Sequence, residues 1–117
     1  MNNITEIASR LTSLCEDHKF IDAYNELFSE HAVSIDPQLK NEPLIGLAAL
    51  LERERQFLAA NDVKEVRISD PLFAGNYFTV TFSLVFTPMG QESKKVEELG
   101  VYKVENGKIT SQQFFIG

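Results

Sequence analysis

Three acidic side chains, those of Asp36, Glu54 and Glu98, stand within or beside apolar segments of this sequence. Asp36 follows the short apolar run "AVSI" and precedes a proline, while the two glutamates fall on the apolar faces of a predicted helix and a predicted strand. Carboxyl groups that share one apolar cavity cannot all ionise, so the pKa of at least one should rise. A carboxylic acid that keeps its proton can donate it, and an ionised neighbour can accept one. The pattern therefore indicates acid–base proton transfer.

Glu54 lies near the middle of the apolar stripe of a helix that Gly46 opens. The members of this stripe are Leu47, Leu50, Leu51, Phe57 and Leu58. A carboxylate is costly there unless it has a partner or water. Two interpretations remain open: Glu54 lines a pocket, or its side chain reaches solvent or pairs with Arg67.

Glu98 shares one face of the predicted strand "KVEELGVYKV" with side chains that suit an interior, Tyr102 and Val104. The alternative is a bulge at Gly100 that turns Glu98 outward. On the last strand Gln112 is in phase with Phe114, so it is either a pocket residue or a structural glutamine.

Other reactive residue types carry no comparable pattern. His18 and His31 lie at predicted helix ends, without a serine, cysteine or carboxylate at the spacing of a catalytic triad or a metal site. Cys15, beside Leu11 and Leu14, is predicted to be a packed thiol. We expect neither a metal nor a cofactor, and Asp36 itself could simply begin an Asx turn.

The elements that must position these residues follow from the hydrophobic periodicity. Residues 4–16 should form an amphipathic helix capped by Asn3, and a second helix should begin after a cap at Asp17. Residues 33–35 are a predicted short strand and 37–45 a loop. The third helix starts after Gly46 and ends at Asn61 and Asp62.

The second half of the chain alternates with a period of two, which indicates strands. In "GNYFTVTFSLVFT" one face carries Phe78, Val80, Phe82, Leu84 and Phe86. Asn106-Gly107 predicts a hairpin between the last two strands. The expected fold is α+β: three N-terminal helices packed on a strongly curved antiparallel sheet of about four long strands. The space between sheet and helices would be cone-shaped, with Phe78, Phe82, Tyr102 and Phe114 facing it.

Length and charge narrow the function. A chain of 117 residues with a net charge of −6 reads as a single domain over 1–117, without general affinity for nucleic acid or anionic membranes. Its first residues lack the basic start and long apolar block of a signal peptide, and one cysteine fits a reducing compartment. We therefore expect a cytoplasmic location.

The order of elements, with "LFSEHAVSIDP" before the loop, "IG" opening the third helix and "VYKVENGKI" in the last hairpin, resembles the SnoaL-like branch of the nuclear transport factor two-like superfamily. That superfamily also contains the ketosteroid isomerases. The resemblance implies a cone-shaped fold with a ligand cavity, and a homodimer through the outer face of the sheet.

The resemblance also implies a role for Asp36, because the isomerases carry an Asp before Pro at this point that acts as general base. Their oxyanion hole uses a Tyr and a protonated Asp, and the corresponding positions here fall near Thr12 and at Gly100. Glu98 or Glu54 could instead donate to a substrate oxygen, with Tyr102 and Tyr24 as further donors. The implied ligand is a small hydrophobic carbonyl compound. The alternatives are a non-catalytic binding module and a dimeric interaction protein whose pocket is vestigial.

Overall fold

The computed structural model describes residues 3–117, which form three α-helices, one short 3₁₀ helix and seven strands. Their order along the chain is α1 (Ile4–Glu16), α2 (Phe20–Leu27), β1 (Phe28–Ile35), η1 (Pro37–Leu39), β2 (Leu44–Ile45), α3 (Leu47–Ala60), β3 (Asn61–Ile68), β4 (Leu72–Ala74), β5 (Tyr77–Pro88), β6 (Lys94–Glu105) and β7 (Lys108–Ile116). Among the described residues, no helix combines the length and apolar character that crossing a bilayer requires.

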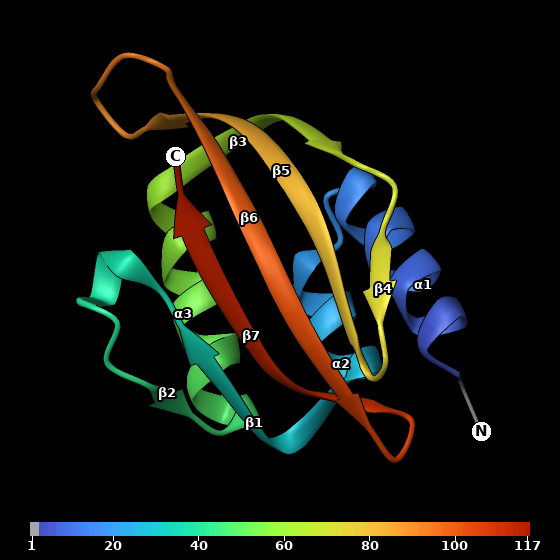
Figure 1. Cartoon of the computed structure of the whole chain (residues 1–117). Coiled ribbons are helices and arrows are strands. Elements are labelled where there is room, and N and C mark those ends of the chain that lie inside the picture. Colours follow the sequence, from blue (N-terminus) through green and yellow to red (C-terminus); the bar gives the residue numbers. More distant parts are fainter. Residues whose placement is uncertain (1–2) are drawn as a thin grey trace.

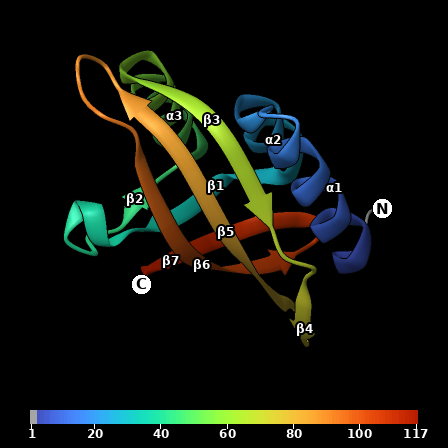
Figure 2. The same cartoon turned by 90° about the horizontal axis from the view of Figure 1, so that it is seen from above.

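All three helices lie on one side of a single curved sheet (Figures 1 and 2). The strand order is β2-β1-β7-β6-β5-β3, with β4 paired to β5. The predicted α+β cone is confirmed, but the sheet is mixed and not wholly antiparallel. Its parallel pair is β1 with β7, the first and last strands, which lie side by side at the end of the sheet nearest α3.

The turn between α1 and α2 differs from the prediction. Asn3 accepts a hydrogen bond from the Glu6 amide, as expected of the cap of α1. Asp17, however, ends α1 and does not begin α2. His18 adopts the left-handed conformation, and its amide and the Lys19 amide donate to the Cys15 and Leu14 carbonyls. This pairing closes the end of α1, so α2 begins only at Phe20.

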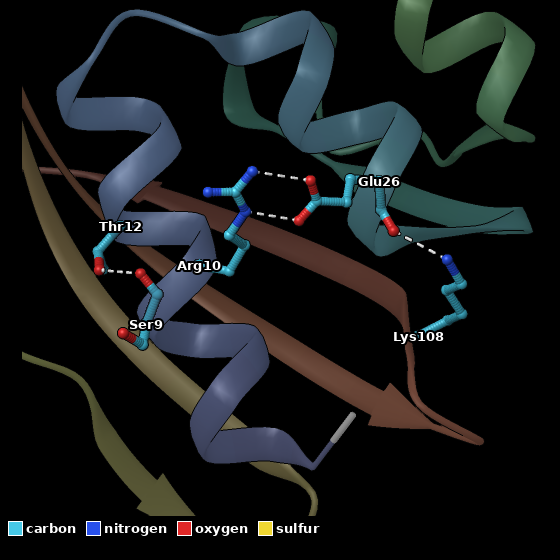
Figure 3. Close-up of polar contacts among 5 residues, drawn as sticks. All are labelled: Ser9, Arg10, Thr12, Glu26 and Lys108. Atoms are coloured by element: carbon cyan, nitrogen blue, oxygen red, sulfur yellow. Dashed lines mark hydrogen bonds and ion pairs between the residues drawn. The ribbon is translucent and has the colours of Figure 1, made fainter. Parts of the chain in front are cut away.

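Arg10 and Glu26 join α1 to α2 through two hydrogen bonds of 2.7 and 3.0 Å (Figure 3). The Lys108 ammonium donates to the Glu26 carbonyl and so ties the end of α2 to β7. Both side chains of the ion pair are largely exposed, so the pair contributes orientation more than stability. Together these contacts fix how α2 lies across the sheet.

The concave face of the sheet forms the core, and its register matches the predicted alternation. Phe82 of β5 pairs with Glu98 of β6, which in turn pairs with Ile116 of β7. There is no shift of register at Gly100; the irregularity in β6 lies later, between Lys103 and Val104. Glu98 therefore shares the inner face with Gly100, as the alternation predicts.

The first strand is longer than predicted, and the two short strands β2 and β4 were not predicted. The first strand starts at Phe28, directly after α2, and not at Val33. The Phe28 side chain is buried in the same core. The short strand β4 turns back onto β5 through Gly75, whose positive φ permits the tight turn.

Candidate functional site

A cavity of about 170 Å³ lies between the helices and the inner face of the sheet. It is lined by Phe20, Tyr24, Asp36, Gln38, Leu50, Arg53, Glu54, Phe57, Val63, Leu84, Phe86, Val96, Glu98 and Phe114. The helices α2 and α3 supply one wall, and strands β5, β6 and β7 supply the other. Most of this lining is aromatic or aliphatic, and the charged groups are Asp36, Arg53 and the two glutamates.

A smaller cavity of about 90 Å³ adjoins the first and reaches Leu11 and Cys15 of α1. Six residues line both cavities and so mark where they meet: Phe20, Tyr24, Glu54, Leu84, Glu98 and Phe114. The two glutamates therefore lie at the boundary between an outer and an inner compartment. The apolar surroundings on both sides disfavour the charged forms of these two carboxyl groups and so raise their pKa values.

Asp36 directly follows β1, is only 6% exposed and lines the outer cavity. One carboxylate oxygen accepts a hydrogen bond from the Gln38 amide at 2.8 Å, which starts η1. The other lies 2.7 Å from the Arg53 guanidinium. The carboxylate thus has the Asx-type contact expected before a proline, together with a cation that the sequence reading did not identify.

Glu98 projects from β6 into the boundary between the cavities. Burial, together with the negative charges of Asp36 and Glu54, raises the pKa of its carboxyl group to about 7, although the positive charge of Arg53 opposes the rise. Among the described residues its carboxyl group forms no ion pair. A carboxyl group in this state exchanges its proton near neutral pH.

Glu54 projects from α3 into the same boundary. Burial raises its pKa, and the neighbouring Arg53 lowers it in part. The alternative partner considered from the sequence, Arg67, is bonded instead to Glu65 on the exposed side of β3. Within residues 3–117 Glu54 forms no ion pair that would account for its place on an apolar helix face, and its side chain lines both cavities.

Gln112 of β7 is buried and its amide nitrogen donates two hydrogen bonds, to the Tyr24 hydroxyl and to Ser34. It lines the inner cavity, as does Tyr102. Burial holds the pKa of Tyr102 well above its ordinary value, so its hydroxyl keeps its proton. Burial likewise raises the pKa of the Cys15 thiol to about 12, so that thiol is not a nucleophile at neutral pH.

The predicted lining residues fall into four groups. Asp36 faces the outer cavity, while Tyr24, Glu54, Glu98 and Phe114 face both. Those that face only the inner cavity are Phe82, Tyr102 and Gln112. Phe78, predicted to line the pocket, lines neither cavity; it is buried in the core, where its ring stacks on that of Tyr102 with centroids 4.9 Å apart.

The two positions that the isomerase resemblance assigns to the oxyanion hole supply no hydrogen-bond donor to either cavity. Thr12 lines neither cavity, and its hydroxyl donates to the Ser9 carbonyl within α1 (Figure 3). At Gly100 an added Cβ would lie only 3.0 to 3.2 Å from the rings of Tyr102, Phe82 and Phe114. Three aromatic rings therefore occupy the space that an aspartate side chain would need.

Two polar residues that were not predicted are important for the site: Arg53, which lines the outer cavity, and Ser34, which accepts a hydrogen bond from Gln112. Arg53 belongs to a run of alternating charges, "ERER", which resembles an exposed helix face. The clue was Asp36, because a carboxylate beside a cavity requires a compensating cation. Ser34 sits in an apolar run, where its hydroxyl gives no signal of the buried glutamine it contacts.

Comparison with known proteins agrees with this fold. The model of the SnoaL-like domain matches residues 2–116, and the chain belongs to that family. No curated protein matches the sequence.

A candidate SnoaL-like polyketide cyclase from Mesorhizobium loti superposes with a TM-score of 0.88 at 25% identity, over 97% of this chain and 99% of that one. A protein with a ketosteroid isomerase-like fold from Catenulispora acidiphila, solved with trimethylamine, gives 0.77 at 17% identity, over 94% and 84%. A candidate polyketide cyclase from Pseudomonas putida gives 0.76 at 11%, over 100% and 93%. The latter two likenesses show the fold alone.

Proposed function

We propose that this protein binds a small, mainly apolar carbonyl compound in the outer cavity and moves a proton on it, as an isomerase or a polyketide cyclase-like enzyme does. The observation that carries the proposal is the division of charge between two carboxyl groups. Asp36 is held in an ion pair with Arg53, while burial and the charge of Asp36 raise the pKa of Glu98 to about 7. A carboxylate paired with a cation and a second carboxyl group that tends to keep its proton suit the roles of base and acid.

In the proposed reaction Asp36 takes a proton from the carbon next to the carbonyl group. The electron pair of the broken C–H bond moves into the carbonyl, and protonated Glu98 donates its proton to the carbonyl oxygen. Asp36 then returns its proton to a different carbon, and Glu98 recovers its own from the oxygen. No oxidant or cofactor is needed, since the substrate and product are isomers.

The cavity supports this assignment in two ways. Each Asp36 oxygen accepts one hydrogen bond, from Gln38 or from Arg53, which leaves further lone pairs free to accept a proton. The mainly apolar lining also strengthens the effect of each charge, because it lowers the local dielectric constant.

The experiment that tests the function is hydrogen exchange of a small ketone in D₂O. Cyclohex-2-enone is incubated with the protein, and deuterium at the positions next to the carbonyl is followed by NMR. We expect exchange above the buffer rate, reduced at least tenfold in Asp36→Asn and in Glu98→Gln. Glu97→Gln, which alters the neighbouring carboxylate on the outer face, should behave as the wild type.

Binding without exchange would favour the alternative of a non-catalytic binding module. Loss of both binding and exchange in the wild type would leave only an interaction role for the fold. The two variants separate these outcomes from a folding defect when their unfolding transitions are recorded alongside.

We also propose that the protein forms a homodimer through the outer face of its sheet. Leu99 and Phe115 pair across β6 and β7 and are both exposed there, close to Thr81 of β5. Light scattering should give the mass of two chains, and Leu99→Asp together with Phe115→Asp should give the mass of one. A monomeric wild type would refute this part of the proposal.

A further inference from the structure

The hydrogen bonds of Gln112 give the Tyr24 hydroxyl a direction. The Gln112 amide nitrogen donates to the Tyr24 oxygen at 2.9 Å and to the Ser34 oxygen at 3.0 Å. A primary amide nitrogen has two hydrogens, so both are used. Gln112 is only 2% exposed and its strand pairs with β1 and β6, so the amide cannot readily turn away.

Because the Tyr24 oxygen accepts a hydrogen bond, its own proton must point elsewhere. Within residues 3–117 no side chain or carbonyl accepts that proton in a hydrogen bond. Tyr24 lines both the outer and the inner cavity, so the free proton faces the space where the two meet. The Tyr24 hydroxyl is thus held by one hydrogen bond at its oxygen, and its proton is available to an acceptor in the cavity.

The surroundings keep that donor protonated. Burial, followed by the negative charge of Glu54, raises the pKa of Tyr24 above its ordinary value, and the bond from Gln112 lowers it only in part. The ring of Tyr24 also packs against Phe28 with centroids 4.7 Å apart, which restricts its movement. The hydroxyl is therefore neutral and fixed in place at physiological pH.

We propose that Tyr24 donates a hydrogen bond to the oxygen of the ligand, and that Gln112 is the positioning residue that turns the hydroxyl proton toward it. This inference rests on the proposed function, because it requires that the cavity take an oxygen-bearing molecule. It also narrows the class of ligand. The acceptor oxygen lies at the boundary between the cavities, so the apolar parts of the ligand extend outward toward Phe57 and inward toward Leu11.

Tyr24 can supply the hydrogen-bond donor that is missing at the two positions assigned to the oxyanion hole. Thr12 and Gly100 provide no donor to a carbonyl oxygen, whereas Tyr24 on α2 reaches the cavity from the helix wall. Glu98 reaches it from the sheet. A carbonyl oxygen between the two would receive hydrogen bonds from opposite sides, which is the arrangement that stabilises charge developing on oxygen.

The test compares two ligands of the same ring size, cyclohex-2-enone and cyclohexene, of which only the first has an oxygen. Their dissociation constants are measured by NMR titration for the wild type and for Tyr24→Phe. The enone should bind about two- to tenfold more weakly to Tyr24→Phe, as expected for one hydrogen bond, while cyclohexene should bind equally to both. Tyr77→Phe, which alters an exposed tyrosine of β5, is the matched control.

A second variant tests the role of Gln112 without removing the tyrosine. A carboxylate only accepts hydrogen bonds, so Gln112→Glu should draw the Tyr24 proton away from the cavity. The infrared carbonyl stretch of the bound enone should be lowered in the wild type relative to the enone in hexane. It should return toward the hexane value in both Tyr24→Phe and Gln112→Glu.

The failures of the two proposals are distinguishable. If neither enone nor cyclohexene binds to the wild type, the proposed function fails and this inference falls with it. If both bind but Tyr24→Phe leaves the affinity for the enone unchanged, or Gln112→Glu leaves the carbonyl stretch unchanged, the donor role is wrong and the binding function stands.

Discussion

The Arg53 guanidinium lies 2.7 Å from the Asp36 carboxylate and joins the middle of α3 to the end of β1 at the rim of the outer cavity. Asp36 exposes only 9% of its side chain, whereas Arg53 exposes 29%. The cation thus faces solvent on one side and compensates a carboxylate that has little water of its own. This ion pair therefore affects both the stability of the fold and the pKa of Glu98.

Replacing Arg53 by methionine should destabilise the protein. The variant keeps the aliphatic packing of the side chain but leaves Asp36 without its cation, which should lower the free energy of unfolding by roughly 1–3 kcal/mol. Arg55→Met serves as the control, because Arg55 is exposed and lies 3.8 Å from Glu52 in a surface ion pair. Urea denaturation measures both, and equal stabilities would show that the pair contributes nothing.

Glu98 should make stability fall as the pH rises. Its carboxyl group has an ordinary pKa of 4.5 in the unfolded chain and about 7 in the folded one. Below pH 4.5 it is protonated in both states. Between these values the folded state holds a proton that the unfolded state has released, so the free energy of unfolding decreases by on the order of 3 kcal/mol by pH 8.

The Glu98→Gln variant should lack this decrease. It should be more stable relative to the wild type at pH 8 than at pH 4, as measured by urea denaturation across that range. Glu97→Gln, on the exposed face of β6, should follow the wild type at every pH. Wild-type and Glu98→Gln curves that stay parallel would mean that Glu98 does not titrate near neutral pH.

The pKa of Glu98 should move in opposite directions when Asp36 and Arg53 are each replaced by a neutral residue. The charge of Asp36 raises this pKa and that of Arg53 lowers it. Asp36→Asn should therefore move it below the wild-type value, and Arg53→Met should move it above. Carbon-detected NMR titration of the glutamate carboxyl signals measures both shifts; shifts of the same sign in both variants would contradict the proposed coupling.

Gly100 should not tolerate a side chain. A methyl group there would lie 3.0 Å from a ring carbon of Tyr102 and 3.1 Å from one of Phe82. Overpacking of this kind should destabilise Gly100→Ala by roughly 1–3 kcal/mol, and Gly100→Asp by more, since the carboxylate would also be buried. Thermal unfolding monitored by circular dichroism gives the comparison, and unchanged stability of the alanine variant would show that the rings move aside easily.

The inner face of the sheet could be predicted from the sequence because its alternation is nearly unbroken. Strand β5 alternates over twelve residues, and Glu98 falls in phase with Tyr102 on a neighbouring strand, so the carboxyl group had to face the same way. The third helix and the Asn106-Gly107 hairpin carry equally local signals. Both turn residues have positive φ, as the hairpin requires.

What could not be predicted depends on contacts between distant segments. The partner of Asp36 lies 17 residues away on another element, and nothing local distinguishes Arg53 from Arg55. The parallel pairing of β1 with β7 joins residues about 80 positions apart and leaves no trace in hydrophobic spacing. The start of α2 differs from the prediction because His18, a non-glycine residue with positive φ, follows the end of the first helix and delays the second.

The pairing of the first strand with the last also determines when the binding chamber comes into being during folding. Strand β7 carries Gln112 and Phe114 and pairs with β6 in a local hairpin but with β1 only across most of the chain. A chain that has formed its helices and hairpins but not the pairing of β1 with β7 therefore still has an open side. Contacts of such large sequence separation form slowly, because the chain must lose much of its freedom before they are made. A ligand added during refolding should therefore gain its affinity only in the final kinetic phase.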